Sequence, residues 1–68
     1  MPILEGDRIE LVRMVDDPDP IPEGTQGTVI SVSEFREAGR DLTVLTVDWD
    51  IDRSLMVILP VDTVRKVA

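Results

Sequence analysis

A chain of 68 residues has room for one small domain, so residues 1–68 are expected to form a single fold. Domains of this size bury a modest core and are usually stabilised by disulfides, a metal ion or a partner subunit. The sequence contains no cysteine and no histidine, which excludes disulfides and the usual zinc ligands. We therefore expect no metal and no cofactor, and the small core favours a homo-oligomer.

The charge balance limits the classes of partner. Fourteen acidic residues against seven basic ones give a formal net charge of −7. Nucleic-acid-binding proteins need a basic patch for phosphate contacts, whereas the basic residues here are scattered among acidic ones. We expect no direct nucleic-acid binding, and a basic protein partner or mimicry of nucleic acid fits the sign of the charge. No apolar run approaches the ~18 residues of a membrane span and no signal peptide is recognisable, so a cytoplasmic location is expected.

The first half of the chain predicts two strands separated by a stiff loop. Residues Asp7 to Met14 alternate in polarity and predict a strand with Ile9 and Leu11 on one face. Val15 to Glu23 is rich in prolines, which keep this loop extended. After the Gly-x-x-Gly turn, Thr28 to Val32 predicts a short β-branched strand.

The second half predicts three more strands. Ser33 to Asp41 is interpreted as a polar connection with one helical turn ended by Gly39. Leu42 to Trp49 predicts a long strand in which Leu45, Val47 and Trp49 share one face. The remaining elements are a tight hairpin at Asp50–Arg53, a strand from Ser54 to Leu59, a 3₁₀-type corner at Pro60–Thr63, and a last strand from Val64 to Val67. Five short strands joined by turns predict an all-β, SH3-like barrel.

The fourth predicted strand is unusual because five apolar residues follow one another: Leu55, Met56, Val57, Ile58 and Leu59. An uninterrupted apolar run predicts a strand buried on both faces. Either the proline loop or the chain ends cover its outer face, or this segment is a subunit interface, most simply of a dimer. The side chains that point away from the core would be either those of Met56 and Ile58 or those of Leu55, Val57 and Leu59.

Two segments carry a resemblance that extends over nearly the whole chain. They are the loop Asp16-Asp17-Pro18-Asp19-Pro20 and the hairpin Val47-Asp48-Trp49-Asp50 followed by Arg53-Ser54-Leu55. In these the chain resembles the domain of unknown function 4314 family of bacteria, phages and plasmids. The sequence departs from the family pattern in its longer Ser33–Asp41 segment and in Ile51-Asp52, where the family prefers Asn-Gly. The resemblance implies the fold and a mobile genetic element, but no activity.

A weaker resemblance is to the plasmid-borne type II dihydrofolate reductases, which are SH3-like barrels assembled around a central pore. Gly6-Asp7-Arg8, Gln26-Gly27 and Pro60-Val61 are similar to segments of those enzymes. The positions that would hold cofactor and substrate in that pore are Val57 and Leu59 here. These apolar side chains cannot form the required hydrogen bonds, so we expect no reductase activity.

The sequence thus predicts a non-enzymatic accessory protein-interaction module. Its expected partner-binding residues are the loop carboxylates and the rim of the neighbouring hairpin: Asp16, Asp17, Asp19, Asp50 and Arg53. The alternatives are calcium binding by the loop, which the intervening prolines disfavour, and an acidic nucleic-acid mimic. Common nucleophile–base pairs cannot be built without His or Cys. Trp49 is predicted to fill the core, with an exposed binding anchor as the alternative.

Overall fold

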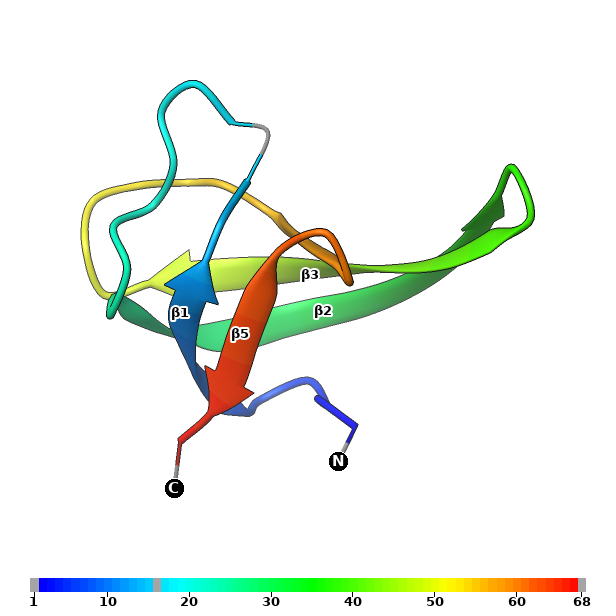
Figure 1. Cartoon of the computed structure of the whole chain (residues 1–68). Coiled ribbons are helices and arrows are strands. Elements are labelled where there is room, and N and C mark those ends of the chain that lie inside the picture. Colours follow the sequence, from blue (N-terminus) through cyan, green and yellow to red (C-terminus); the bar gives the residue numbers. More distant parts are fainter. Residues whose placement is uncertain (1, 16, 68) are drawn as a thin grey trace.

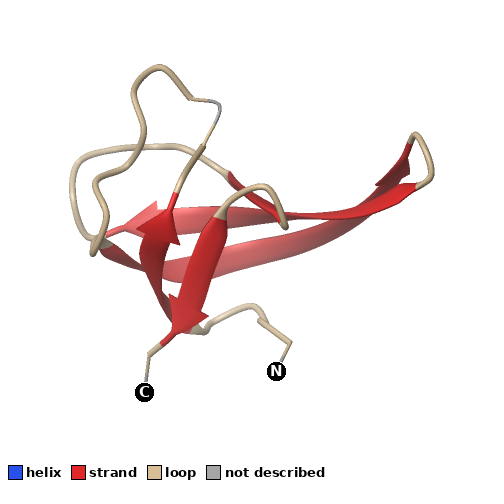
Figure 2. Ribbon diagram, viewed as in Figure 1, coloured by secondary structure: helices blue, strands red, loops and turns tan. Residues whose placement is uncertain are grey.

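The computed structural model describes residues 2–15 and 17–67, and within these it contains strands, loops and turns (Figure 2). Five strands form one antiparallel sheet in the order β4-β3-β2-β1-β5. They are β1 (Arg8–Arg13), β2 (Gln26–Glu37), β3 (Arg40–Trp49), β4 (Val57–Leu59) and β5 (Thr63–Lys66). The sheet bends so that β1 and β5 cross over β2 and β3 (Figure 1). The predicted all-β, five-stranded fold is confirmed.

The core lies between the two crossing halves of the sheet. Its buried side chains come from β1, β2, β3 and β4 and from the proline loop, and they are Ile9, Leu11, Ile21, Val29, Leu45, Val47, Trp49 and Val57. The inward faces expected from alternation in β1 and β3 are confirmed. Trp49 is only 4% exposed, and its indole N–H donates a hydrogen bond to the Leu55 carbonyl at 2.9 Å. It is therefore a core residue and not an exposed anchor.

Gly27 allows β2 and β3 to approach closely. A Cβ atom at this buried position would lie 2.7 Å from Val47 Cγ1 and 2.8 Å from the Asp48 carbonyl oxygen. The carbonyl belongs to the backbone of β3 and cannot move without disturbing the ladder between the strands. The second glycine of the Gly-x-x-Gly turn is thus explained by packing.

The expected polar connection at Ser33–Asp41 is wrong. Strand β2 continues to Glu37, and β3 begins at Arg40, so the two strands form a hairpin that projects from the body as an arm (Figure 1). The turn consists of Ala38 and Gly39, whose φ angles are +51° and +77°. A two-residue turn with positive φ at both positions matches the twist of the two flanking strands. This geometry therefore favours a β-hairpin and not a helical turn. The sequence did not indicate this hairpin, because Arg36, Glu37 and Ala38 are residues that favour a helix.

The expected tight hairpin at Asp50–Arg53 is also wrong, because β4 begins only at Val57. The β3–β4 pairing runs from Thr43↔Leu59 to Leu45↔Val57, and the chain between Trp49 and Val57 forms a longer loop. The carbonyl of Leu55 accepts a hydrogen bond from the Trp49 indole, and the Arg53 guanidinium donates one to the proline loop. These bonds replace the strand pairing that the sequence predicted for Ser54 to Met56.

Ala38→Asn is expected to stabilise the fold. Ala38 is exposed and has a left-handed backbone conformation that an ordinary side chain adopts at a cost, whereas Asn-Gly is a preferred pair in this turn. The expected gain in the free energy of unfolding is about 0.5–1 kcal/mol by urea denaturation. The control Ala38→Val, which is β-branched, should lose stability. Equal stability of both variants and the wild type would contradict the assignment of the turn.

Candidate interaction surface

The proline loop carries three of the predicted partner-binding residues, of which Asp16 lies outside the described residues. Asp17 Oδ1 accepts a hydrogen bond from the backbone N–H of Asp19 at 2.9 Å. The Asp19 amide can form this bond because residue 19 is not a proline. The carboxylate of Asp19 remains 87% exposed.

Arg53 joins this loop to the segment that follows β3. Its guanidinium donates to the Asp19 carbonyl oxygen at 2.6 Å and lies 3.6 Å from the Asp19 carboxylate. The structure thus brings Asp17, Asp19 and Arg53 together, as the expected rim requires. The guanidinium neutralises part of the charge that this surface would present to a basic partner.

Asp50 lies apart from that group and binds β1. Both of its oxygens accept hydrogen bonds from Arg8, at 2.9 and 2.5 Å, and Arg8 also donates to Thr28 Oγ1 at 3.0 Å. The hydrogen bonds from Arg8 lower the pKa of Asp50 below its usual value. A two-bond pair of this kind fixes the start of the loop after β3, so Asp50 has a structural partner.

Two further ion pairs connect β1 and its preceding turn to β5. Arg65 donates to both oxygens of Glu10, and Lys66 lies 3.3 Å from Asp7. The bonds from Arg65 lower the pKa of Glu10. The pKa of Asp7 is lowered first by the backbone N–H of Leu4 and then by Lys66. Cations are therefore interleaved with the acidic side chains along β1 and β5.

Asp62 is the buried acidic residue among the described positions, with 6% of its surface exposed. One side-chain oxygen accepts from the Val15 N–H at 3.1 Å and the other from the Ile58 N–H at 3.0 Å. The side chain therefore joins the β4–β5 corner to the start of the proline loop. Sequence analysis missed this role, because no pattern marks a single aspartate as buried.

The side chains of the apolar run, which includes β4 and the two residues before it, alternate between the core and the outer surface. Val57 is fully buried, with Leu55 and Leu59 packed against the same core. Met56 is 57% exposed and Ile58 is 40% exposed, so the outward set consists of these two. Of the two alternatives for this face, cover by the proline loop or the chain ends is not seen among the described residues.

The exposed face continues from β4 across β3 onto the arm. Val44 of β3 lies opposite Ile58, and Leu42, on the same face, lies opposite Phe35 of β2. Phe35 is 56% exposed. We call this set of five residues the outer strip: Met56, Ile58, Val44, Leu42 and Phe35. Phe35 was not predicted as part of a surface, because its segment was expected to be a connection.

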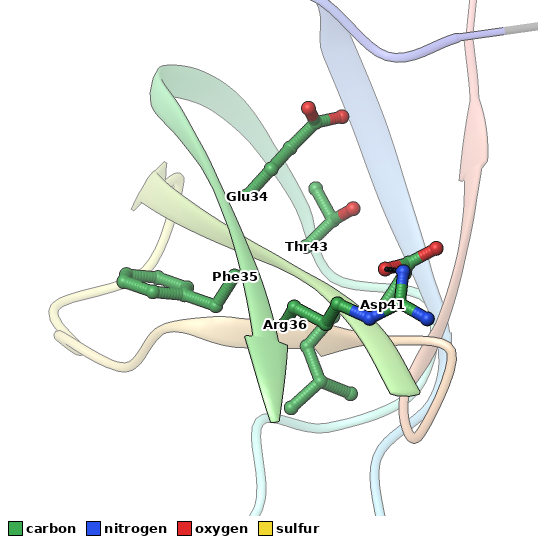
Figure 3. A pocket seen from close by; sticks show the side chains of 6 residues that line it. Glu34, Phe35, Arg36, Asp41 and Thr43 are labelled. Atoms are coloured by element: carbon green, nitrogen blue, oxygen red, sulfur yellow. Dashed lines mark hydrogen bonds and ion pairs between the residues drawn. The ribbon is translucent and has the colours of Figure 1, made fainter. Parts of the chain in front are cut away.

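The other face of the arm is polar. Glu34 and Thr43 project from the opposite side of the strands to Phe35, and Arg36 pairs with Asp41 at 3.3 Å (Figure 3). An open hollow beside the arm is lined by residues of both faces, which are Glu34, Phe35, Arg36, Asp41, Leu42 and Thr43. The arm thus has one apolar and one charged face.

Within residues 2–15 and 17–67, no three acidic side chains come close enough to hold a metal ion. In that same part of the chain, no helix is long and apolar enough to cross a membrane.

Comparison with known proteins gives one match. The model of a family described as a domain of unknown function, DUF4314, matches residues 3–67. No curated protein and no solved structure matches the chain.

Replacing Asp62 is expected to destabilise the domain. Asp62→Ala leaves the N–H groups of Val15 and Ile58 without their acceptor, which should cost about 1–3 kcal/mol in urea denaturation. The control is Asp52→Ala, which removes the same charge at an exposed position and should change stability by less than about 0.5 kcal/mol. Equal losses in the two variants would show that the charge, and not the buried bonds, matters.

Stability is expected to fall in acid through Glu10 and Asp50. Their pKa values are lowered in the folded state, so the folded chain binds fewer protons than the unfolded chain. This contribution is complete above the unfolded values near 4.5 and 3.8 and is lost as the pH falls through the lowered ones. Urea denaturation at several pH values should therefore show Glu10→Gln and Asp50→Asn less stable than wild type at neutral pH, with the difference vanishing in acid. A difference independent of pH would contradict this.

Proposed function

The chain belongs to the DUF4314 family, and we propose that it is a non-enzymatic protein-interaction module that binds its partner through the outer strip. The supporting observation is the apolar character of this face on a small acidic chain. Phe35, Met56 and Ile58 each expose 40% or more of their surface, and half-buried Val44 and Leu42 connect them. Apolar side chains gathered on one face, as opposed to scattered singly, are typical of protein-binding surfaces.

The rim of the outer strip indicates the chemistry of the partner. By strand alternation, Asp48 lies beyond the strip at one end of β3, and the Glu37–Arg40 pair lies at the arm tip. The chain as a whole carries a net charge of −7. We therefore propose a protein with an apolar contact area surrounded by basic residues, since opposite charges steer association.

The acidic loop is the second contact that we propose. Asp19 keeps an exposed carboxylate, and Asp17 and Arg53 lie beside it. A basic rim of the partner can bind there while the ion pair between Arg8 and Asp50 holds the neighbouring loop in place. Asp16 belongs to the same proposed contact by its position in the sequence.

The absence of enzymatic activity is part of the proposal. The carboxylates of Glu10, Asp50 and Asp62 are occupied by Arg65, Arg8 and two backbone amides. Val57, which replaces a hydrogen-bonding side chain of the reductases, lies in the core of its own chain. A residue buried there does not line a pore between subunits. The resemblance to domains of phages and plasmids further supports an accessory role on a mobile genetic element, in the cytoplasm.

Photo-crosslinking in cells tests the proposed surface. A photoreactive residue replaces Ile58 in one variant and Val12 in another, because both side chains are about 40% exposed and Val12 lies on β1, outside the outer strip. We expect a defined crosslinked protein partner from position 58 only. Addition of Met56→Lys to the position 58 variant should reduce this product at least tenfold by weakening the contact.

Two results would contradict the proposal. The first is the same set of products from positions 12 and 58, which would indicate non-specific contact. The second is no crosslinked protein from position 58 while a photoreactive residue at Asp19 gives one, which would place the binding surface on the acidic loop alone.

A further inference from the structure

The arm has an unpaired strand edge. On the side away from β3, β2 pairs with β1 only from Gln26 to Thr28, and the last bonds on that side join Val29 to Gly6 and Asp7. Beyond Val29, the described residues that pair with β2 are those of β3 (Figure 1). An unpaired edge presents backbone donors and acceptors to another strand.

The turn determines which backbone groups face this edge. In a two-residue hairpin with positive φ at both turn positions, the flanking residues Glu37 and Arg40 form the closing hydrogen-bonded pair. Antiparallel alternation then directs the N–H and C=O groups of Phe35 toward β3. Those of Glu34 and Arg36 therefore point to the open edge.

We propose that the occupant of this edge is a second copy of the chain, paired antiparallel through its own β2 arm about a two-fold axis at Phe35. In this register Glu34 lies opposite Arg36 of the other copy, and the same pair recurs by symmetry. Four backbone hydrogen bonds form between the outward groups. The two Phe35 side chains meet in a non-hydrogen-bonded pair, where side chains approach most closely.

Charge complementarity selects this register. Hydrogen bonds between the two copies require residues whose N–H and C=O groups point to the open edge to lie opposite one another. The two-fold axis must therefore pass through a residue of the arm. The registers next to the proposed one have this axis at Glu34 or at Arg36. Those registers place two Glu34 carboxylates or two Arg36 guanidinium groups directly opposite each other. Like charges in that position are destabilising. Glu34 has no ion pair within the described chain, whereas Arg36 lies 3.3 Å from Asp41 and can bind a second carboxylate.

This dimer would enlarge the outer strip. The two-fold axis is perpendicular to the joined sheet, so both copies present Phe35 and Leu42 on the same side. The partner proposed above would then meet a face of twice the width. The dimer itself uses the strand edge and not this face, so the two proposals can fail separately.

The test is sedimentation velocity of the full chain between about 10 μM and about 1 mM, because an interface of two short strands is at the weak end of specific contacts. Wild type should change from monomer to dimer in this range. Glu34→Arg and Arg36→Glu each place like charges opposite one another and should raise the dissociation constant about tenfold or more. An equimolar mixture of the two variants restores both unlike pairs and should dimerise like wild type.

Circular dichroism first establishes that each variant is folded, and Glu37→Gln, which leaves the opposed pair intact, is the matched control. Rescue in the mixture is the decisive result, because general charge effects would not produce it. A wild type that stays monomeric at 1 mM overturns the proposal. A dimer that persists in both variants, or one lost in Met56→Lys but kept in Glu34→Arg, also overturns it and leaves the outer strip as the self-association surface.

Discussion

The side chain of Asp62 accepts hydrogen bonds from the backbone of Val15 and Ile58, and the closure of this small fold depends on that contact. The edge strands β4 and β5 are at opposite ends of the sheet order and do not pair with each other. Asp62 links the corner between them to the proline loop. This loop in turn carries Ile21 into the core, where it is almost fully buried. A domain without disulfides thus uses one buried polar side chain to position a loop that supplies part of its core.

The body of the domain and the arm differ in how their side chains are used. In the body, ion pairs such as Arg8–Asp50 and Arg65–Glu10 join segments distant in sequence, and the carboxylates are used for folding. The arm contains the exposed Phe35, an open strand edge, and Glu34, which forms no ion pair with the described residues. These features contribute little to the core. We therefore assign the body to stability and the arm and outer strip to binding.

The sequence predicted the elements whose pattern is local and failed where tertiary contacts decide. Alternation identified Ile9 and Leu11 and the buried face of β3. The five-residue apolar run forms a strand of only three residues, Val57–Leu59, in which Ile58 is exposed. One helical turn was expected before Gly39, because composition does not reveal that Ala38 also adopts a positive φ. The roles of Asp62 and Asp50 depend on partners that are 47 and 42 residues away in the chain, and no local pattern reports such contacts.

Amide hydrogen exchange by NMR at low and high protein concentration tests this account most directly. The Val15 and Ile58 amides should exchange slowly at both concentrations, because Asp62 accepts their hydrogens within one chain. The Glu34 and Arg36 amides should exchange rapidly in dilute solution and become protected as the arms pair. Protection at Glu34 and Arg36 that does not depend on concentration, together with rapid exchange at Val15 and Ile58, would contradict both the closed body and the open arm.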